Sequence, residues 1–246
     1  MILLVDVGNS RVKWAVFDGE KLGPMQTGEI PADRLLPARL YKLRRPELVV
    51  VCNVAGPLVA RTLREEVTQA YDVPVRFAVA AREACGVRNA YADPAQLGAD
   101  RWAAMIGAFT EHGGPICVVD AGTACTVDVI DREGRHLGGA IAPGINLMIS
   151  SLRNRTQDIA AFEKAHPGGG AGLLANNTAD GLRNGALNAL AGLVDRAAGQ
   201  AESSTGQQLL VALTGGDGER LHDLLLRRTH YNPALVLCGL AKLAAD

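Results

Sequence analysis

Short apolar runs alternate along this chain with longer segments in which apolar residues recur every three to four positions. The short runs predict strands, and the periodic segments predict amphipathic helices. In the first half we expect strands over 2–6, 11–17, 21–29, 48–54 and 73–80, and helices over 31–45, 57–70 and 98–112. Strands that alternate with helices are typical of an α/β sheet.

The second half repeats this order after Gly113-Gly114, which we expect to end the helix over 98–112. Strands are predicted over 116–120, 126–131, 135–141 and 208–213, and helices over 144–153, 178–199, 218–228 and 234–244. Segments 168–170 and 201–206 are predicted to be surface loops. The repeat predicts a duplicated fold with half-domains over residues 1–114 and 115–246.

One short motif stands at the end of an apolar strand in each half. The two copies are Val5-Asp6-Val7-Gly8-Asn9-Ser10 and Val119-Asp120-Ala121-Gly122-Thr123-Ala124. Glycine lets backbone N–H groups approach a ligand closely, and the carboxylate can hold a metal ion, so such a turn suits the phosphates of a nucleotide. Lys13, on the returning strand, could neutralise phosphate charge. The alternatives are an Asx-type hairpin turn at Asp120 and a solvated Lys13.

Composition narrows the class of protein. The 246 residues are 48% hydrophobic with a formal net charge of −1, which gives no broad positive surface for nucleic acid or an anionic membrane. The five cysteines show no CxxC spacing, and no apolar stretch is long enough for export or for spanning a membrane. We therefore expect a cytoplasmic protein with reduced, mostly buried thiols. The five histidines show no zinc-ligand spacing and are predicted surface or loop residues.

A third motif, Thr214-Gly215-Gly216-Asp217, follows the apolar strand near the end of the chain. Neither a GxxxxGK[ST] loop nor a GxGxxG fingerprint is present in the sequence, which disfavours P-loop and Rossmann nucleotide sites. Two Asp-Gly hairpins followed by a late Thr-Gly-Gly turn resemble the actin, hexokinase and Hsp70 ATPase superfamily. That resemblance implies an α/β fold of two duplicated ribonuclease-H-like half-domains, with ATP in a central cleft.

Further motifs make the resemblance closer. Tyr91, Gly98-Ala99-Asp100-Arg101, the segment 138–144, Asn177-Thr178 and the segment 214–217 together resemble the type III pantothenate kinase family. The resemblance covers nearly the whole chain. It implies phosphorylation of the primary hydroxyl of pantothenate by ATP, the first step towards coenzyme A.

The family's site residues carry over onto matching positions of this chain. The first phosphate motif is Asp6, Val7, Gly8, Asn9, Ser10, Arg11, Val12 and Lys13, in which Asp6 is the expected partner of Mg²⁺. Asp120 matches the ligand of a monovalent cation, K⁺ or NH₄⁺, and Thr123 matches a second phosphate contact. The adenosine motif is Thr214, Gly215 and Gly216. The pantothenate positions are Tyr91, Gly98, Ala99, Asp100, Arg101 and Thr178, and Asp100 matches the proposed base.

Three alternatives stay open at this point. Asp100-Arg101 can also be read as a helix N-terminal turn with a surface ion pair. The family resembles Bvg accessory factors, which share these motifs and were named for a role in transcription, so a regulator without kinase activity has the same pattern. A kinase of another small alcohol fits the motifs as well.

The predicted helix from Thr178 carries an apolar face that one core would not fully cover. Its apolar positions are Leu182, Ala186, Ala189, Leu190, Leu193 and Val194. We therefore expect a homodimer, as the resemblance also implies, with the pantothenate pocket near the subunit boundary.

Overall fold

The computed structural model describes residues 1–8, 11–30, 35–40, 43–155 and 172–246. Internal contacts divide the chain into two units. Unit 1 comprises Met1–Gly114, Ile130–Gly138 and Ala234–Asp246, and unit 2 comprises Pro115–Val129 and Gly139–Pro233. The half-domains over 1–114 and 115–246 stay a prediction.

Unit 1 is built on a mixed sheet of five strands, β1 (Ile2–Val7), β2 (Arg11–Phe17), β3 (Gln26–Glu29), β4 (Leu48–Asn53) and β5 (Val75–Phe77). Their order is β3-β2-β1-β4-β5. The first strand pairs antiparallel with β2 and parallel with β4. Side chains are buried on both faces of β1, as expected for a central strand between helical layers.

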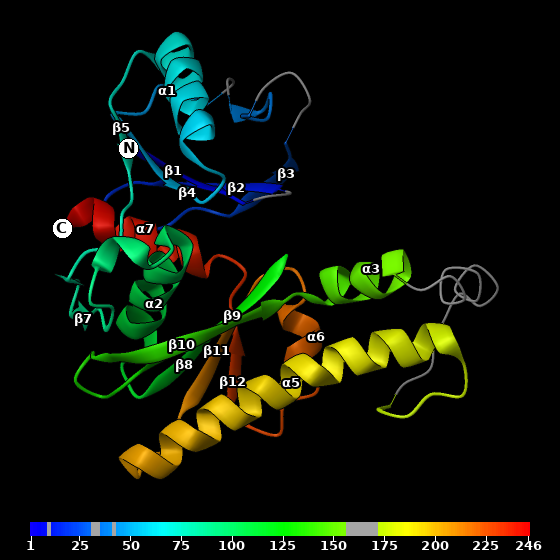
Figure 1. Ribbon diagram of the computed structural model, residues 1–246. Helices are drawn as coiled ribbons and strands as arrows, with labels where there is room; N and C mark the ends of the chain where they lie inside the picture. Colours follow the sequence, from blue (N-terminus) through cyan, green and yellow to red (C-terminus); the bar gives the residue numbers. More distant parts are fainter. Residues whose placement is uncertain (9–10, 31–34, 41–42, 156–171) are drawn as a thin grey trace. The chain divides into compact units, whose positions relative to one another are not determined.

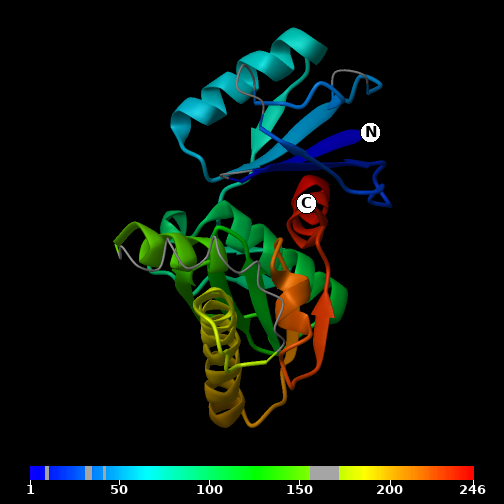
Figure 2. The same cartoon turned by 90° about the vertical axis from the view of Figure 1, so that its right-hand side faces the viewer.

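Helices cover both faces of this sheet. Helix α1 (Pro57–Tyr71) packs Leu63, Val67 and Tyr71 against apolar residues of β1, β2 and β4, and both views show it along one face (Figures 1 and 2). Helices α2 (Ala99–His112) and α7 (Leu235–Ala245) pack against each other, and α7 also contacts β1, β2 and β4. A Cβ added to Gly239 would collide with the backbone of Ala103, so the two helices meet backbone to backbone.

Short elements connect this core to α2. Strands β6 (Glu83–Ala84) and β7 (Val87–Arg88) form a small hairpin, and η2 (Pro94–Gln96) is a 3₁₀ turn. The Asp93 carboxylate caps that turn by accepting a hydrogen bond from the Ala95 N–H.

Unit 2 repeats the strand order of unit 1. Its sheet contains β8 (Ile116–Ala121), β9 (Ala124–Ile130), β10 (His136–Pro143), β11 (Leu210–Thr214) and β12 (Thr229–Tyr231), in the order β10-β9-β8-β11-β12. Strand β8 stands where β1 stands in the first sheet, and it is likewise parallel to the next strand, β11. The duplicated α/β topology predicted from the sequence is confirmed, and the central cleft stays a prediction.

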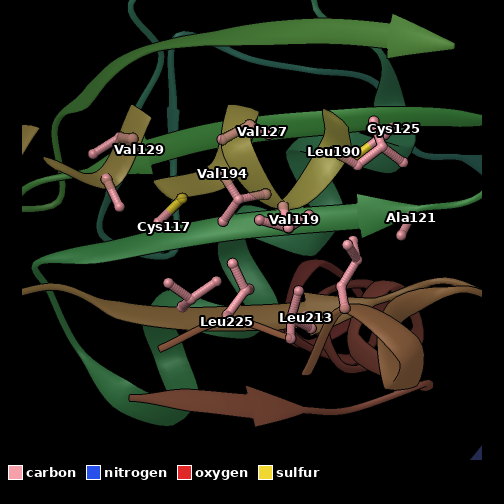
Figure 3. Close-up of a cluster of buried hydrophobic side chains, with 14 of the residues drawn as sticks. Cys117, Val119, Ala121, Cys125, Val127, Val129, Leu190, Val194, Leu213 and Leu225 are labelled. Carbon is pink, nitrogen blue, oxygen red and sulfur yellow. The ribbon is translucent and has the colours of Figure 1, made fainter. Parts of the chain in front are cut away.

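The described residues of unit 2 include the helices α3 (Ile145–Arg155), α5 (Thr178–Thr205) and α6 (Gly218–His222). The long helix α5 runs along one face of the sheet (Figure 1). Its buried residues Leu190 and Val194 pack against Cys117, Val119 and Val127 of β8 and β9 (Figure 3). No helix within the described ranges combines the length and the apolar character needed to cross a membrane.

Several element predictions need correction. A helix over 31–45 was expected, but residues 35–40 and 43–45 form turns and coil, because Pro37 cannot continue a helix. The other residues of this segment, 31–34 and 41–42, lie outside the described residues. In the segment 201–206, residues 201–205 form the last turn of α5 and Gly206 is its C-cap, so the segment is not a loop. Strand β5 and helix α6 are shorter than the segments 73–80 and 218–228. The loop predicted at 168–170 lies outside the described residues.

The cysteine prediction is confirmed in part and the histidine prediction is wrong at one position. None of the five cysteines forms a disulfide; Cys52, Cys117 and Cys125 are buried, whereas Cys85 and Cys238 are half-buried. His136 is only 4% exposed on β10, where a surface position was expected. The cytoplasmic location stays a prediction.

Candidate active site

In unit 1 the first Asp-Gly turn is held by strand pairing. Asp6 on β1 lies directly opposite Lys13 on β2, and the neighbouring pair Val7 and Val12 is buried. The Gly8 N–H donates a hydrogen bond of 3.1 Å to the Arg11 carbonyl oxygen and closes the turn. The register therefore sets a carboxylate beside an ammonium group at the end of a buried strand. Asn9 and Ser10 of the same motif lie outside the described residues.

In unit 1, two of the residues predicted to bind pantothenate, Tyr91 and Arg101, are in contact. The Arg101 guanidinium donates a hydrogen bond of 3.1 Å from Nη1 to the Tyr91 hydroxyl, and its central carbon lies 5.8 Å from the centroid of the Tyr91 ring. Arg101 is 5% exposed, so the alternative of a surface ion pair is wrong. A buried arginine with its guanidinium fixed by a neighbour suits bidentate binding of a carboxylate.

The expected base lies in the first turn of α2. Gly98 is the N-cap and Ala99 the first helical residue, and the half-buried Asp100 follows. Its Oδ1 accepts a hydrogen bond of 2.8 Å from the Arg101 N–H, where a negative charge is favoured by the helix dipole. A Cβ added to Gly98 would lie 2.5 Å from Asp100 Oδ1. Glycine at 98 therefore leaves the room that this carboxylate occupies.

In unit 2 the second Asp-Gly turn and the Thr-Gly-Gly loop are in direct contact. Asp120 at the end of β8 lies opposite Thr214 at the end of β11. The Asp217 N–H donates a 3.0 Å hydrogen bond to the Ala121 carbonyl oxygen, and a Cβ added to Gly215 would lie 2.5 Å from Asp120 Oδ1. Gly215 also has a φ of +86°, a conformation that favours glycine. The fold thus brings together two motifs that the sequence separates widely.

The residue before α3 contacts the second Asp-Gly turn. The Gly144 N–H donates a 2.9 Å hydrogen bond to the Thr123 carbonyl oxygen, and the Gly122 N–H donates one of 3.0 Å to the Ala124 carbonyl oxygen. Thr123 itself is exposed. Its hydroxyl and the turn around it are therefore accessible to a ligand.

Acidic groups surround the end of β8. Burial, together with the smaller effect of the charges of Asp120 and Asp217, raises the pKa of the Cys125 thiol to about 12. The pKa of Tyr231 is also raised, chiefly by burial and then by Glu219 and Asp120. The secondary, electrostatic part of both shifts comes from carboxylates, and carboxylates gathered at one place favour a bound cation.

A cavity of about 570 Å³ lies where α3, α5 and α6 meet. The buried Ile145 and Ile149 contribute apolar side chains to it. Its polar lining residues are Asn146, Ser150, Arg153, Arg183 and Arg220. An apolar wall with several guanidinium groups suits a flat heterocycle that carries anionic groups.

Two of the three arginines that line the cavity form ion pairs with aspartates that lie in or near the sequence motifs. Arg220 lies 3.1 Å from Asp217, and Arg183 lies 3.7 Å from Asp180. The cavity therefore adjoins the loop at 214–217 through Arg220 and the turn at Thr123 through Gly144 and Ile145. Sequence reasoning missed these arginines, since they are isolated residues on three different helices.

Thr214 is completely buried, and its hydroxyl oxygen has no hydrogen-bond partner among the residues that the structure describes. An unsatisfied buried hydroxyl is uncommon in folded proteins and is frequently explained by a missing ligand or solvent.

Thr178 belongs to unit 2, whereas the other predicted pantothenate residues belong to unit 1. It is the exposed first residue of α5, whose N-cap Asn177 accepts a hydrogen bond of 3.0 Å from the Asp180 N–H. It lines a groove between α3 and α5 that is otherwise mostly apolar.

Solved structures share this fold at low sequence identity. A conserved putative Baf family transcriptional activator from Campylobacter jejuni is 23% identical with a TM-score of 0.61, covering 98% of this chain and 96% of that chain. A putative 2-dehydro-3-deoxygalactonokinase from Sinorhizobium meliloti is 14% identical with a TM-score of 0.62, covering 100% of this chain and 98% of that one. Together these likenesses confirm the predicted fold class.

Sequence comparisons give the family. The model of the type III pantothenate kinase family matches residues 2–200. Curated type III pantothenate kinases from Azoarcus sp. (strain BH72) and Nitrosococcus oceani are 43% and 37% identical, over 100% of this chain and 91% and 94% of theirs. With an alignment that spans the whole chain at this identity, the chain belongs to the type III pantothenate kinase family.

Proposed function

We propose that this chain transfers the γ-phosphoryl group of ATP to the primary hydroxyl of pantothenate, giving 4'-phosphopantothenate in the first step of coenzyme A biosynthesis. Family membership gives the reaction. The observation that carries the proposal is the contact between the Asp120 turn and the Thr214–Asp217 loop, with the arginine-lined cavity beside both. These features form the nucleotide half of the site within unit 2.

ATP is assigned to this half as follows. The nucleoside occupies the arginine-lined cavity against Ile145 and the loop at 214–216, and the phosphates lie at Thr123. In unit 1, Lys13 and the turn from Asp6 are assigned to the phosphates as well. The buried hydroxyl of Thr214 supports a polar ligand at this loop.

Arg183→Gln is expected to raise KM for ATP about tenfold, because a charged hydrogen-bond donor is lost from the cavity. KM for pantothenate should change by less than about twofold. Arg196→Gln is the matched control, since Arg196 is an exposed residue of the same helix that does not line the cavity. Equal KM values for ATP in the two variants would argue against nucleotide binding there.

Two cations are part of the proposal. Asp6 is assigned to Mg²⁺ and Asp120 to a monovalent cation, K⁺ or NH₄⁺. Carboxylate oxygens are ligands that Mg²⁺ prefers, and the carboxylates of Asp120 and Asp217 favour a positive ion. Bound Mg²⁺ supplies neutralisation of the charge on the β- and γ-phosphates.

On the acceptor side, Arg101 is assigned to the carboxylate of pantothenate and Asp100 to its primary hydroxyl. Phosphoryl transfer passes through a loose transition state, so alignment of the hydroxyl matters more than a strong base. Asp100 orients the hydroxyl and accepts its proton late in the transfer. The hydrogen bond between Arg101 and Tyr91 keeps the guanidinium in place while the carboxylate is bound.

Release of ADP in a coupled assay tests the function directly. With Mg²⁺ and K⁺ present, we expect turnover that depends on added pantothenate. A regulator without kinase activity would give none, and a kinase of another small alcohol would be revealed when that alcohol competes with pantothenate.

We also propose a homodimer. The groove between α3 and α5 exposes apolar side chains, among them Leu152 at 47%, and the small residues Gly181, Gly185 and Ala189 line it on the α5 side. Small residues let a second helix approach closely, and exposed apolar area of this kind marks an interaction surface. The groove is therefore assigned to a second copy of this chain. A sedimentation mass of one chain at micromolar concentration would contradict it.

A further inference from the structure

Besides Arg101, the ring of Tyr91 has an aromatic neighbour that lies in none of the sequence motifs. The imidazole of His136 is stacked on it, with ring centroids 6.0 Å apart and planes 14° from parallel. His136 is 4% exposed, so this contact is made inside the protein. The same Tyr91 ring contacts the Arg101 guanidinium through its hydroxyl and its face. A chain of three contacting groups thus runs from His136 through Tyr91 to Arg101.

His136 is presented by a turn with its own hydrogen-bond network. The buried Asp131 carboxylate accepts hydrogen bonds from the Arg135 N–H at 2.8 Å and from Arg135 Nε at 2.6 Å. The Gly134 carbonyl oxygen accepts a 2.8 Å hydrogen bond from the Arg88 N–H of β7. These bonds fix the turn from which the histidine projects, although β10 belongs to the sheet of unit 2 while residues 130–138 belong to unit 1.

The backbone of Tyr91 is fixed independently of its ring. The Tyr91 N–H donates a 2.9 Å hydrogen bond to Asn89 Oδ1. The Arg82 guanidinium donates to the carbonyl oxygens of Tyr91 at 2.9 Å and Ala92 at 2.7 Å. The freedom that remains is rotation of the side chain. Stacking against a buried ring restricts that rotation, because aromatic pairs favour particular geometries.

We infer that His136 is a positioning residue for the acceptor site. It does not touch the substrate. By holding the ring of Tyr91, it holds the hydroxyl that binds Arg101, and so it fixes the guanidinium in the direction needed for the carboxylate of the acceptor. The inference rests on the proposed function, in which Arg101 binds that carboxylate.

The test compares His136→Leu with His136→Phe. Leucine fills most of the volume without a planar ring, whereas phenylalanine keeps a ring for stacking. We expect His136→Leu to raise KM for pantothenate about fivefold, a change within the range of aromatic pair energies, with kcat and KM for ATP within about twofold of the original chain. His136→Phe should restore KM for pantothenate to within about twofold.

A double-mutant cycle with Tyr91→Leu separates positioning from a general effect on folding. If His136 acts through Tyr91, His136→Leu should not raise KM for pantothenate further in the Tyr91→Leu background. Equal KM values in the original chain and His136→Leu, no rescue by phenylalanine, or additive effects in the cycle would overturn the inference. If the original chain showed no turnover that depends on pantothenate, the proposed function would be overturned instead.

Discussion

Asp100→Asn is expected to lower kcat by about 100- to 10,000-fold, with KM for ATP within about twofold. The amide keeps the size of the side chain and still accepts a hydrogen bond from the Arg101 N–H, so the first turn of α2 should be preserved. It cannot accept the proton of the attacking hydroxyl. The loss should therefore fall on the chemical step, which single-turnover measurement of phosphopantothenate formation resolves.

Asp93→Asn is the matched control for this variant. Asp93 is an exposed aspartate that caps the preceding 3₁₀ turn through a 3.0 Å hydrogen bond from the Ala95 N–H, and asparagine can accept the same bond. Its kcat should stay within about twofold of the original value. Nearly unchanged turnover in Asp100→Asn would remove the assignment of the base.

Gly215→Ala is expected to destabilise the protein by about 2–4 kcal/mol and to raise KM for ATP strongly. The φ of +86° is strained for alanine, and its Cβ would collide with the Ala121 carbonyl group and Asp120 Oδ1. Relief of the collision must move the β11–α6 loop away from the end of β8, which separates the adenosine motif from the cation site. Thermal unfolding and the ATP dependence of turnover measure the two effects.

Gly216→Ala is a matched control one residue away. A Cβ added to Gly216 meets no atom within 4 Å, and the residue is exposed. We expect its free energy of unfolding to change by less than about 0.5 kcal/mol, so it is a control for the stability effect. Equal losses of unfolding free energy in the two alanine variants would show that contact between Gly215 and Asp120 does not hold the nucleotide half together.

The duplicated topology could be predicted from the sequence because its signals are local. Each sheet begins with an apolar strand, an Asp-Gly turn and a returning strand, and these are patterns of a few residues. The helix predicted over 31–45 was wrong because apolar spacing was weighted above Pro37. The end of α5 was missed because Ser203 and Thr205 suggest a loop, whereas their hydroxyls donate to the Gly199 and Ala201 carbonyl oxygens within the helix.

The candidate site likewise contains some residues that the sequence predicts and some that it does not. Residues in glycine-containing motifs, such as Asp120 and Thr214, could be proposed because their neighbours in sequence are also their neighbours in the site. Arg183, Arg220 and His136 have no such neighbours. They reach their positions through the packing of α5, α6 and the β9–β10 turn, which depends on contacts between distant parts of the chain.

The backbone contact between α2 and α7 has a consequence for synthesis on the ribosome. Unit 1 needs residues 234–246 to complete its packing, so the helix that carries Asp100 and Arg101 emerges long before its partner at Gly239. Unit 2 has no such requirement, since its last residue precedes α7. Unit 1 therefore stays incompletely packed until α7 has been made, whereas every residue of unit 2 has been synthesised by then.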